Sequence, residues 1–160
     1  MSMKKLFTTR ALVQSAIIAA LYAALTVINP WGYGSVQVRV SEALCVLSMF
    51  APSSVFGLFV GCLLANIIGG FGIIDIICGS IATGAAAYFT YKFRNNFALA
   101  MFFPVIFNAV IVGGYLYILY DKTYPMLATM GFVGLGQLIA CYGIGGMLYV
   151  ALKNRSGFLQ

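Results

Sequence analysis

The sequence predicts an all-α, multi-pass membrane protein with six transmembrane helices and both termini in the cytoplasm. Of its 160 residues, 62% are apolar and only 8% are charged, and the mean hydropathy is +1.01. An ordinary soluble domain is about 25% charged, so we expect lipid rather than water to surround most of this chain. A membrane-crossing helix needs about 20 residues, so six crossings occupy about 120 residues, and we expect one integral membrane domain over residues 1–160.

Six apolar segments define the predicted helices, at approximately 10–28, 40–51, 54–70, 73–91, 98–120 and 126–151. No A-x-A-like cleavage site follows the first, so we expect a retained helix rather than a signal peptide. Residues 29–38 are rich in turn formers and predict an ordered loop or a short hairpin. The short second and third segments predict a tight helical hairpin, because Pro52 breaks one helix and the serines after it can cap the next.

The distribution of basic residues sets the predicted orientation. With the N-terminus inside, seven basic residues lie on the cytoplasmic side and two lie outside. The inside residues are Lys4, Lys5, Arg10, Lys92, Arg94, Lys153 and Arg155, and the outside residues are Arg39 and Lys122. Because such an excess marks the cytoplasmic side of membrane proteins, the net charge of +6 indicates topology, and we expect no nucleic-acid partner.

Missing residue types exclude several kinds of chemistry. The chain has no histidine, so an imidazole base, a His-containing triad and a histidine-ligated metal are excluded. Its four cysteines stand singly in apolar runs and are expected to be small buried residues rather than a disulfide or zinc framework. No G-x-x-x-x-G-K-[ST] motif occurs, so we expect neither a bound ATP nor enzyme activity on this chain.

Polar residues within apolar segments are the candidate binding residues, since such side chains are costly in lipid. They are Glu42, Asn66 and Asp75 near the predicted outer ends, and Asn108 and Gln137 deeper in their segments. This arrangement predicts an outward-facing polar pocket, with the two deeper amides as its floor. Three alternatives stay open: Glu42 pairs with Arg39, Asp75 offsets a helix N-terminus, and the amides join helices by hydrogen bonds.

Two further patterns point to surfaces that contact other molecules. Aromatic residues gather at the predicted outer end, including Trp31 and Tyr115. An interfacial belt explains most of them, and stacking on a planar ligand is the alternative. In the first segment, Ala16, Ala20 and Ala24 recur every four residues and form a smooth stripe. Such a stripe permits close approach of another helix, either from this chain or from a partner.

The ordered blocks of the sequence resemble a known family. They are VRVSEAL at 38–44, GLFVGCLLAN at 57–66, DIICGSIAT at 75–83, PVIFNA at 104–109 and VGLGQL at 133–138. Together they resemble the QueT family over nearly the whole chain. These proteins are substrate-binding S components of energy-coupling factor (ECF) transporters, which import queuosine precursors. One difference is Gln137, because a glutamate is common in the family at that position.

The resemblance implies a six-helix protein of the bacterial cell membrane that binds its ligand near the outer face. It implies docking through Ala16, Ala20 and Ala24 onto a transmembrane coupling subunit, with two ATPase subunits as further partners. The implied ligand is a 7-deazaguanine such as prequeuosine-1 or queuine, whose ring edge carries N–H donors beside an O6 acceptor. Alternatives are an S component for another flat vitamin-like ligand and a stand-alone small permease.

Candidate contacts for that ligand follow from the polar and aromatic residues of the outer half. They are Glu42, Asn66, Asp75, Asn108, Gln137, Arg39, Trp31 and Tyr115. Prequeuosine-1 carries an aminomethyl cation in addition to its ring edge, so we expect the two carboxylates to divide the ring edge and the cation between them. The sequence leaves open which carboxylate takes which group.

Overall fold

The computed structural model describes residues 8–29, 38–70, 72–119 and 122–153, and within them almost every residue is helical and none is in a strand. The α-helices are α1 (Thr9–Ile28), α2 (Ser53–Ile68), α3 (Ser80–Lys92), α4 (Phe97–Phe107), α5 (Gly113–Leu119), α6 (Met126–Leu138) and α7 (Gly145–Lys153). The remaining helices are the 3₁₀-helix η3 (Val40–Met49) and the π-helical turns η4 (Asp75–Gly79), η5 (Asn108–Val112) and η6 (Ile139–Ile144). The all-α prediction is confirmed.

The helical stretches follow the predicted segments closely. Each π-turn continues an α-helix, so that residues 73–92, 97–119 and 126–153 form three long rods. The ends of all the helical stretches differ from the predicted ends by no more than two residues. Within the described ranges, three helices are long and apolar enough to cross a membrane: Thr9–Ile28, Phe97–Leu119 and Met126–Lys153. That the chain crosses the membrane six times, and that both termini are cytoplasmic, remain predictions.

Local sequence accounts for two helix N-termini and for one missing backbone hydrogen bond inside a helix. The side chain of Thr8 accepts a hydrogen bond from the Ala11 amide at 3.3 Å, and that of Asn96 accepts from the Leu99 amide at 3.2 Å, so both cap helices. Pro104 lies inside α4 and has no N–H to donate to the Ala100 carbonyl one turn earlier. The Thr90 hydroxyl of α3 donates to that carbonyl instead, at 3.0 Å.

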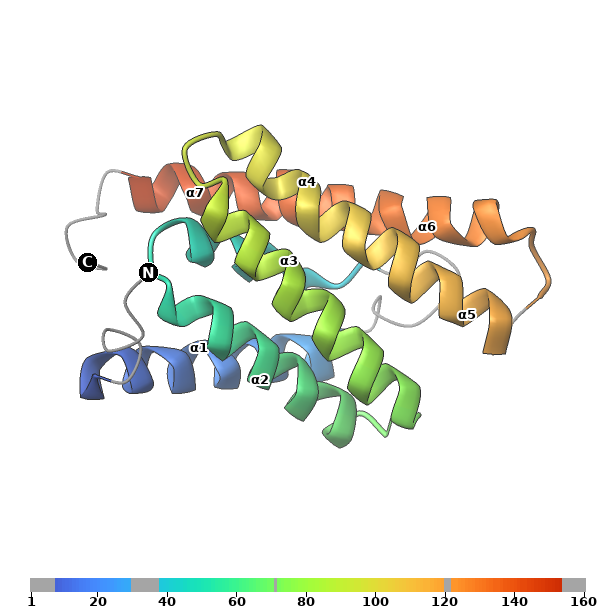
Figure 1. The fold of residues 1–160 in the computed structure, drawn as a ribbon, viewed down its shortest axis with the longest axis horizontal. Helices are drawn as coiled ribbons and strands as arrows, with labels where there is room; N and C mark the ends of the chain where they lie inside the picture. The colour runs from blue at the N-terminus through green and yellow to red at the C-terminus, as the bar shows by residue number, and fades with distance from the viewer. Residues whose placement is uncertain (1–7, 30–37, 71, 120–121, 154–160) are drawn as a thin grey trace.

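The helices pack in layers around the short η3. Figure 1 shows α1 and α2 on one side of the bundle and the α6–α7 rod on the other, with α3 crossing between them. α1 packs on α2, α2 on α3, α3 on α4 and α5 on α6. η3 contacts α1, α2, α3, α4, α7 and η6. A side chain on η3 can therefore meet groups from most of the bundle.

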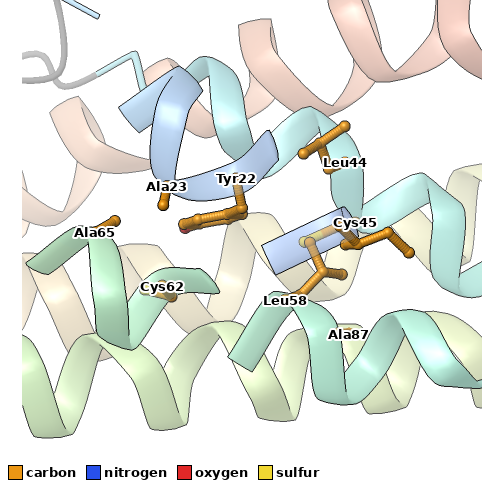
Figure 2. Packing of buried hydrophobic residues seen from close by; sticks show 9 residues of the cluster. Tyr22, Ala23, Leu44, Cys45, Leu58, Cys62, Ala65 and Ala87 are labelled. Carbon is orange, nitrogen blue, oxygen red and sulfur yellow. The ribbon is translucent and has the colours of Figure 1, made fainter. Parts of the chain in front are cut away.

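Glycines permit the close approach of α1 and α2. A Cβ atom on Gly61 would lie 2.8 Å from the Tyr22 Cβ, and one on Gly57 would lie 2.7 Å from the Ser15 carbonyl oxygen. Tyr22 belongs to a cluster of buried hydrophobic side chains at this seam. Figure 2 shows it there with Ala23, Cys62 and Ala65. The seam between the two helices is thus too narrow for a side chain at either glycine, as expected for helices that associate in lipid.

Large apolar side chains cover the outside of the long helices. Leu127 on α6 is 82% exposed, Ile28 on α1 is 76% exposed and Val150 on α7 is 67% exposed. Soluble monomers rarely expose apolar surface on this scale. The distribution fits a protein whose outer surface is solvated by lipid.

Candidate functional site

Glu42 of η3 is the centre of a buried polar network. Its side chain has no exposed surface, and its Oε1 atom accepts hydrogen bonds from the Tyr22 hydroxyl and from the Thr83 hydroxyl, the latter at 2.8 Å. Its Oε2 atom has longer contacts, with the Asn108 Nδ2 at 3.4 Å and the Cys45 sulfur at 3.4 Å. Burial of a carboxylate is costly unless donors surround it. Here α1, α3, η5 and η3 each supply one.

A second polar cluster surrounds Asp75 at the start of η4. The Tyr115 hydroxyl donates to the Asp75 Oδ1 at 2.7 Å, and the Asn66 Nδ2 donates to the Asp75 backbone carbonyl at 2.8 Å. Gly79 lies directly beside them, because a Cβ there would be 3.2 Å from the Asn66 Nδ2 and 3.6 Å from the Tyr115 hydroxyl. Asp75 therefore binds a side chain from α2 through its backbone carbonyl and one from α5 through its carboxylate.

Arg39 and Cys62 connect the two clusters. The Cys62 sulfur lies 3.5 Å from the Thr83 hydroxyl and 3.6 Å from the Asn66 Nδ2. Arg39 is only 4% exposed, and its electrostatic neighbours include Glu42 and Tyr115. A buried guanidinium, which carries only donors, therefore lies within electrostatic range of both clusters.

Gln137 joins this polar centre from the α6 side. It is 2% exposed, and its Oε1 accepts from the Cys141 sulfur at 3.7 Å. The same sulfur lies 3.8 Å from the Glu42 backbone carbonyl. Seven of the eight candidate contacts are thus buried and linked through the polar centre, whereas Trp31 lies outside the described residues.

The structure brings Glu42 into contact with one of the two deeper amides. Glu42 was expected level with Asn66 and Asp75, above a floor that includes Asn108, but the structure places it in contact with Asn108. The reason is that the chain is already inside the bundle where η3 begins, since Arg39 and Ser41 are buried as well. The first residues of η3 therefore lie among buried side chains.

The irregular helices coincide with the candidate residues. Asp75 begins η4, Asn108 begins η5, Gln137 lies two residues before η6, and Glu42 lies in the ten-residue η3. Runs of 3₁₀-helix beyond three or four residues are uncommon, and π-turns inside α-helices are frequent at functional sites. The distortions of the backbone therefore gather around the polar centre.

Tyr22, Thr83 and the buried cysteines are part of the centre that sequence reasoning missed. Tyr22 and Thr83 carry the strongest hydrogen bonds to Glu42. A hydroxyl group within an apolar segment was the sequence signal that could have identified each of them. The four cysteines are free, and all except the half-buried Cys78 are buried, as expected. Among the described residues, no group of three His, Cys, Asp or Glu side chains could hold a metal ion.

The alanine stripe of α1 faces away from the polar centre. Ala16, Ala20 and Ala24 are exposed, whereas Ala19 and Ala23, which flank this stripe on its inward side, are buried. The inward face also carries the residues that bond to η3. The stripe is therefore not used for packing among the described residues, and it leaves a smooth surface on the outside of the bundle.

These features define a helical membrane protein with a buried polar centre, and comparison with known sequences narrows the class further. The chain belongs to the QueT transporter family, whose model matches residues 12–154. It is 28% identical over 161 positions to the queuosine precursor transporter QueT of Lactococcus lactis subsp. cremoris (strain MG1363), covering 92% of this chain and 94% of the relative. No solved structure is significantly similar. The protein is therefore a transporter and not an enzyme.

Proposed function

We propose that this chain is the substrate-binding S component of an ECF-type importer in the bacterial cell membrane, and that it captures a queuosine precursor. The observation that carries the proposal is the polar centre around Glu42, buried inside a bundle whose surface is apolar. Intramembrane carboxylates are costly and mark substrate sites by default. The name of the Lactococcus relative supplies the ligand class.

The polar centre suits a 7-deazaguanine ring. Such a ring presents N–H donors on one edge and an O6 acceptor beside them. Glu42, Asp75, Asn66, Asn108 and Gln137 supply the acceptors in this proposal, and Tyr115 adds an aromatic face. The Arg39 guanidinium is the donor that fits O6, because it is buried near Glu42. Trp31 stays a candidate for stacking.

The outer face of α1 is the proposed docking surface for a transmembrane coupling subunit. Helices associate in lipid through small residues that allow their backbones to approach. Ala16, Ala20 and Ala24 provide such a surface, exposed along three turns of α1. The chain carries no phosphate-binding loop of the Walker type, so two ATPase subunits are the proposed source of energy.

Reconstitution in proteoliposomes tests this function. The chain alone is expected to bind a labelled 7-deazaguanine precursor but not to transport it, whereas adding the coupling subunit and both ATPases should give ATP-dependent uptake. Uptake by the chain alone would instead support the stand-alone permease. Binding of riboflavin, thiamine or folate in preference to the 7-deazaguanine would assign the same scaffold to another flat ligand.

A further inference from the structure

Two buried amide oxygens in the polar centre have no hydrogen-bond partner. They are the Oδ1 atoms of Asn66 and Asn108, on side chains that are 0% and 1% exposed. Two serine hydroxyls, on Ser48 and Ser54, are also unpartnered. A hydroxyl can rotate toward a nearby carbonyl, but an amide oxygen can only accept. Both amides therefore present an acceptor that the described residues leave unsatisfied.

The orientation of the Asn108 amide is determined by its neighbours. Its Nδ2 lies 2.9 Å from the Pro104 carbonyl oxygen and 3.4 Å from the Glu42 Oε2. Both neighbours are acceptors, so rotating the amide by half a turn would set its oxygen against two other oxygens. The Oδ1 atom must therefore be the amide atom that does not face the Pro104 carbonyl, and it belongs to the same amide group whose Nδ2 contacts Glu42 Oε2.

The two oxygens of Glu42 are unequally occupied. Oε1 accepts from two hydroxyls, those of Tyr22 and Thr83, while Oε2 has only the long contacts to Asn108 and to the Cys45 sulfur. Each oxygen has two donors, but Oε1 has two hydroxyls, whereas Oε2 has a weak S–H donor and an amide at 3.4 Å, longer than an ordinary N–H···O bond. The hydroxyls thus fix the rotation of the carboxylate and leave Oε2, in contact with the Asn108 amide, as its more weakly bonded oxygen.

We propose that Glu42 Oε2 and Asn108 Oδ1 form a paired acceptor that receives two adjacent N–H groups from the flat edge of the ligand. Tyr22 and Thr83 are positioning residues that hold the carboxylate for this contact. The proposal rests on the proposed function and assigns Glu42, rather than Asp75, to the ring edge. It selects ligands with an N–H next to a ring-bound amino group, as in the 2-amino lactam of 7-deazaguanine.

Comparison of two ligands on the native protein is the first test. 7-Deazaguanine has both donors, whereas 7-deazahypoxanthine lacks the 2-amino group and keeps only one. Loss of a hydrogen bond to a charged or buried acceptor predicts at least about tenfold weaker binding of the second ligand, measured by titration of the purified protein. Equal affinities would overturn the paired acceptor. Failure of both ligands to bind would instead count against the proposed function.

Substitution at Asn108 locates the discrimination. In Asn108→Leu, which keeps the branched shape at Cγ but has no acceptor, the preference for 7-deazaguanine should fall to within about threefold, because the second donor has no partner. Asn66→Leu is the matched control, since it removes the other unpartnered oxygen but leaves Glu42 and Asn108 in place. It should retain the tenfold preference, whatever its effect on overall affinity. An unchanged preference in Asn108→Leu would refute the assignment.

The positioning residues are tested in pairs with Glu42. Tyr22→Phe and Thr83→Val each remove one donor to Oε1, and each should weaken 7-deazaguanine about three- to tenfold in the native background. In the Glu42→Gln background, the same substitutions should have little further effect, because the carboxylate that they orient is gone. Equal losses in both backgrounds would show that the hydroxyls act only on the structure of the bundle.

Discussion

The seam between α1 and α2 allows a sharp test of the packing, through Gly61→Ala. The added Cβ would lie 2.8 Å from the Tyr22 Cβ, 2.9 Å from the Ala19 Cα and 3.0 Å from the Ala19 carbonyl oxygen. Carbon atoms in contact prefer about 3.5 to 4.0 Å, so relief of the 2.8 Å contact requires α1 to move away by roughly 0.7 to 1.2 Å. No flexible side-chain end can absorb this, because the contacts are with backbone and Cβ atoms.

The expected cost follows from two opposing effects. Overpacking of this kind destabilises by about 1 to 3 kcal/mol, while replacing a helical glycine by alanine contributes about 0.5 to 1 kcal/mol of stability. Because the clashes here involve backbone atoms, we place the overpacking cost in the upper part of its range, so the net loss of folding stability is about 1 to 2 kcal/mol. For a chain of this size, the midpoint of thermal unfolding should fall by about 2 to 8 °C. The outward shift of Tyr22 should also weaken ligand binding.

Thermal unfolding in detergent, followed with a thiol-reactive dye, suits this protein. Three of its four free cysteines are buried, so their labelling reports loss of the folded core. Gly131→Ala is the matched control, because a Cβ on that α6 glycine meets nothing within 4 Å and should leave the midpoint unchanged or raise it. If Gly61→Ala unfolds at or above the temperature of Gly131→Ala, the close approach of α1 and α2 is not required.

Two further predictions concern docking and the second carboxylate. Ala20→Leu should abolish co-purification with the coupling subunit while ligand binding persists. The control Ala98→Leu, at an exposed alanine of α4, should leave both complex formation and ligand binding intact. Normal complex formation in Ala20→Leu would exclude α1 as the docking surface. Asp75→Asn should weaken the binding of an aminomethyl-bearing 7-deazaguanine at least about tenfold more than that of neutral 7-deazaguanine, because only the former carries a cation. Equal losses of affinity in a binding titration would show that Asp75 does not bind the cation.

Helix positions could be predicted because they depend on local sequence. A continuous apolar run identifies a membrane helix without knowledge of its neighbours, and Pro52 marks a break wherever the chain lies. For this reason the predicted segments and the observed helices agree to within two residues. The conformation of residues 40–49 could not be predicted in the same way. Its 3₁₀ form reflects packing against six neighbouring elements, which no local pattern encodes.

Candidate polar residues could be named from the sequence because lipid penalises them wherever they lie in a segment. Glu42, Asn108 and Gln137 stood out for this reason, and the structure places all three in one buried centre. Tyr22 and Thr83 were not predicted, because the free-energy cost of placing a tyrosine or threonine in lipid is too small to mark it as a binding residue. Only the approach of α1 and α3 to η3 turns their hydroxyls into donors for one oxygen of Glu42.

The sequence alone determined that this protein is helical, lipid-solvated and equipped with a few polar side chains that lipid does not explain. The tertiary structure decided which side of each helix faces inward. In a soluble protein, the apolar face of a helix identifies the core, but here lipid and core are both apolar, so the contrast is lost. Two rows of alanine on α1 look alike in sequence, yet Ala19 and Ala23 pack inside while Ala16, Ala20 and Ala24 remain exposed. The contacts of neighbouring helices, not hydropathy, separate the two rows.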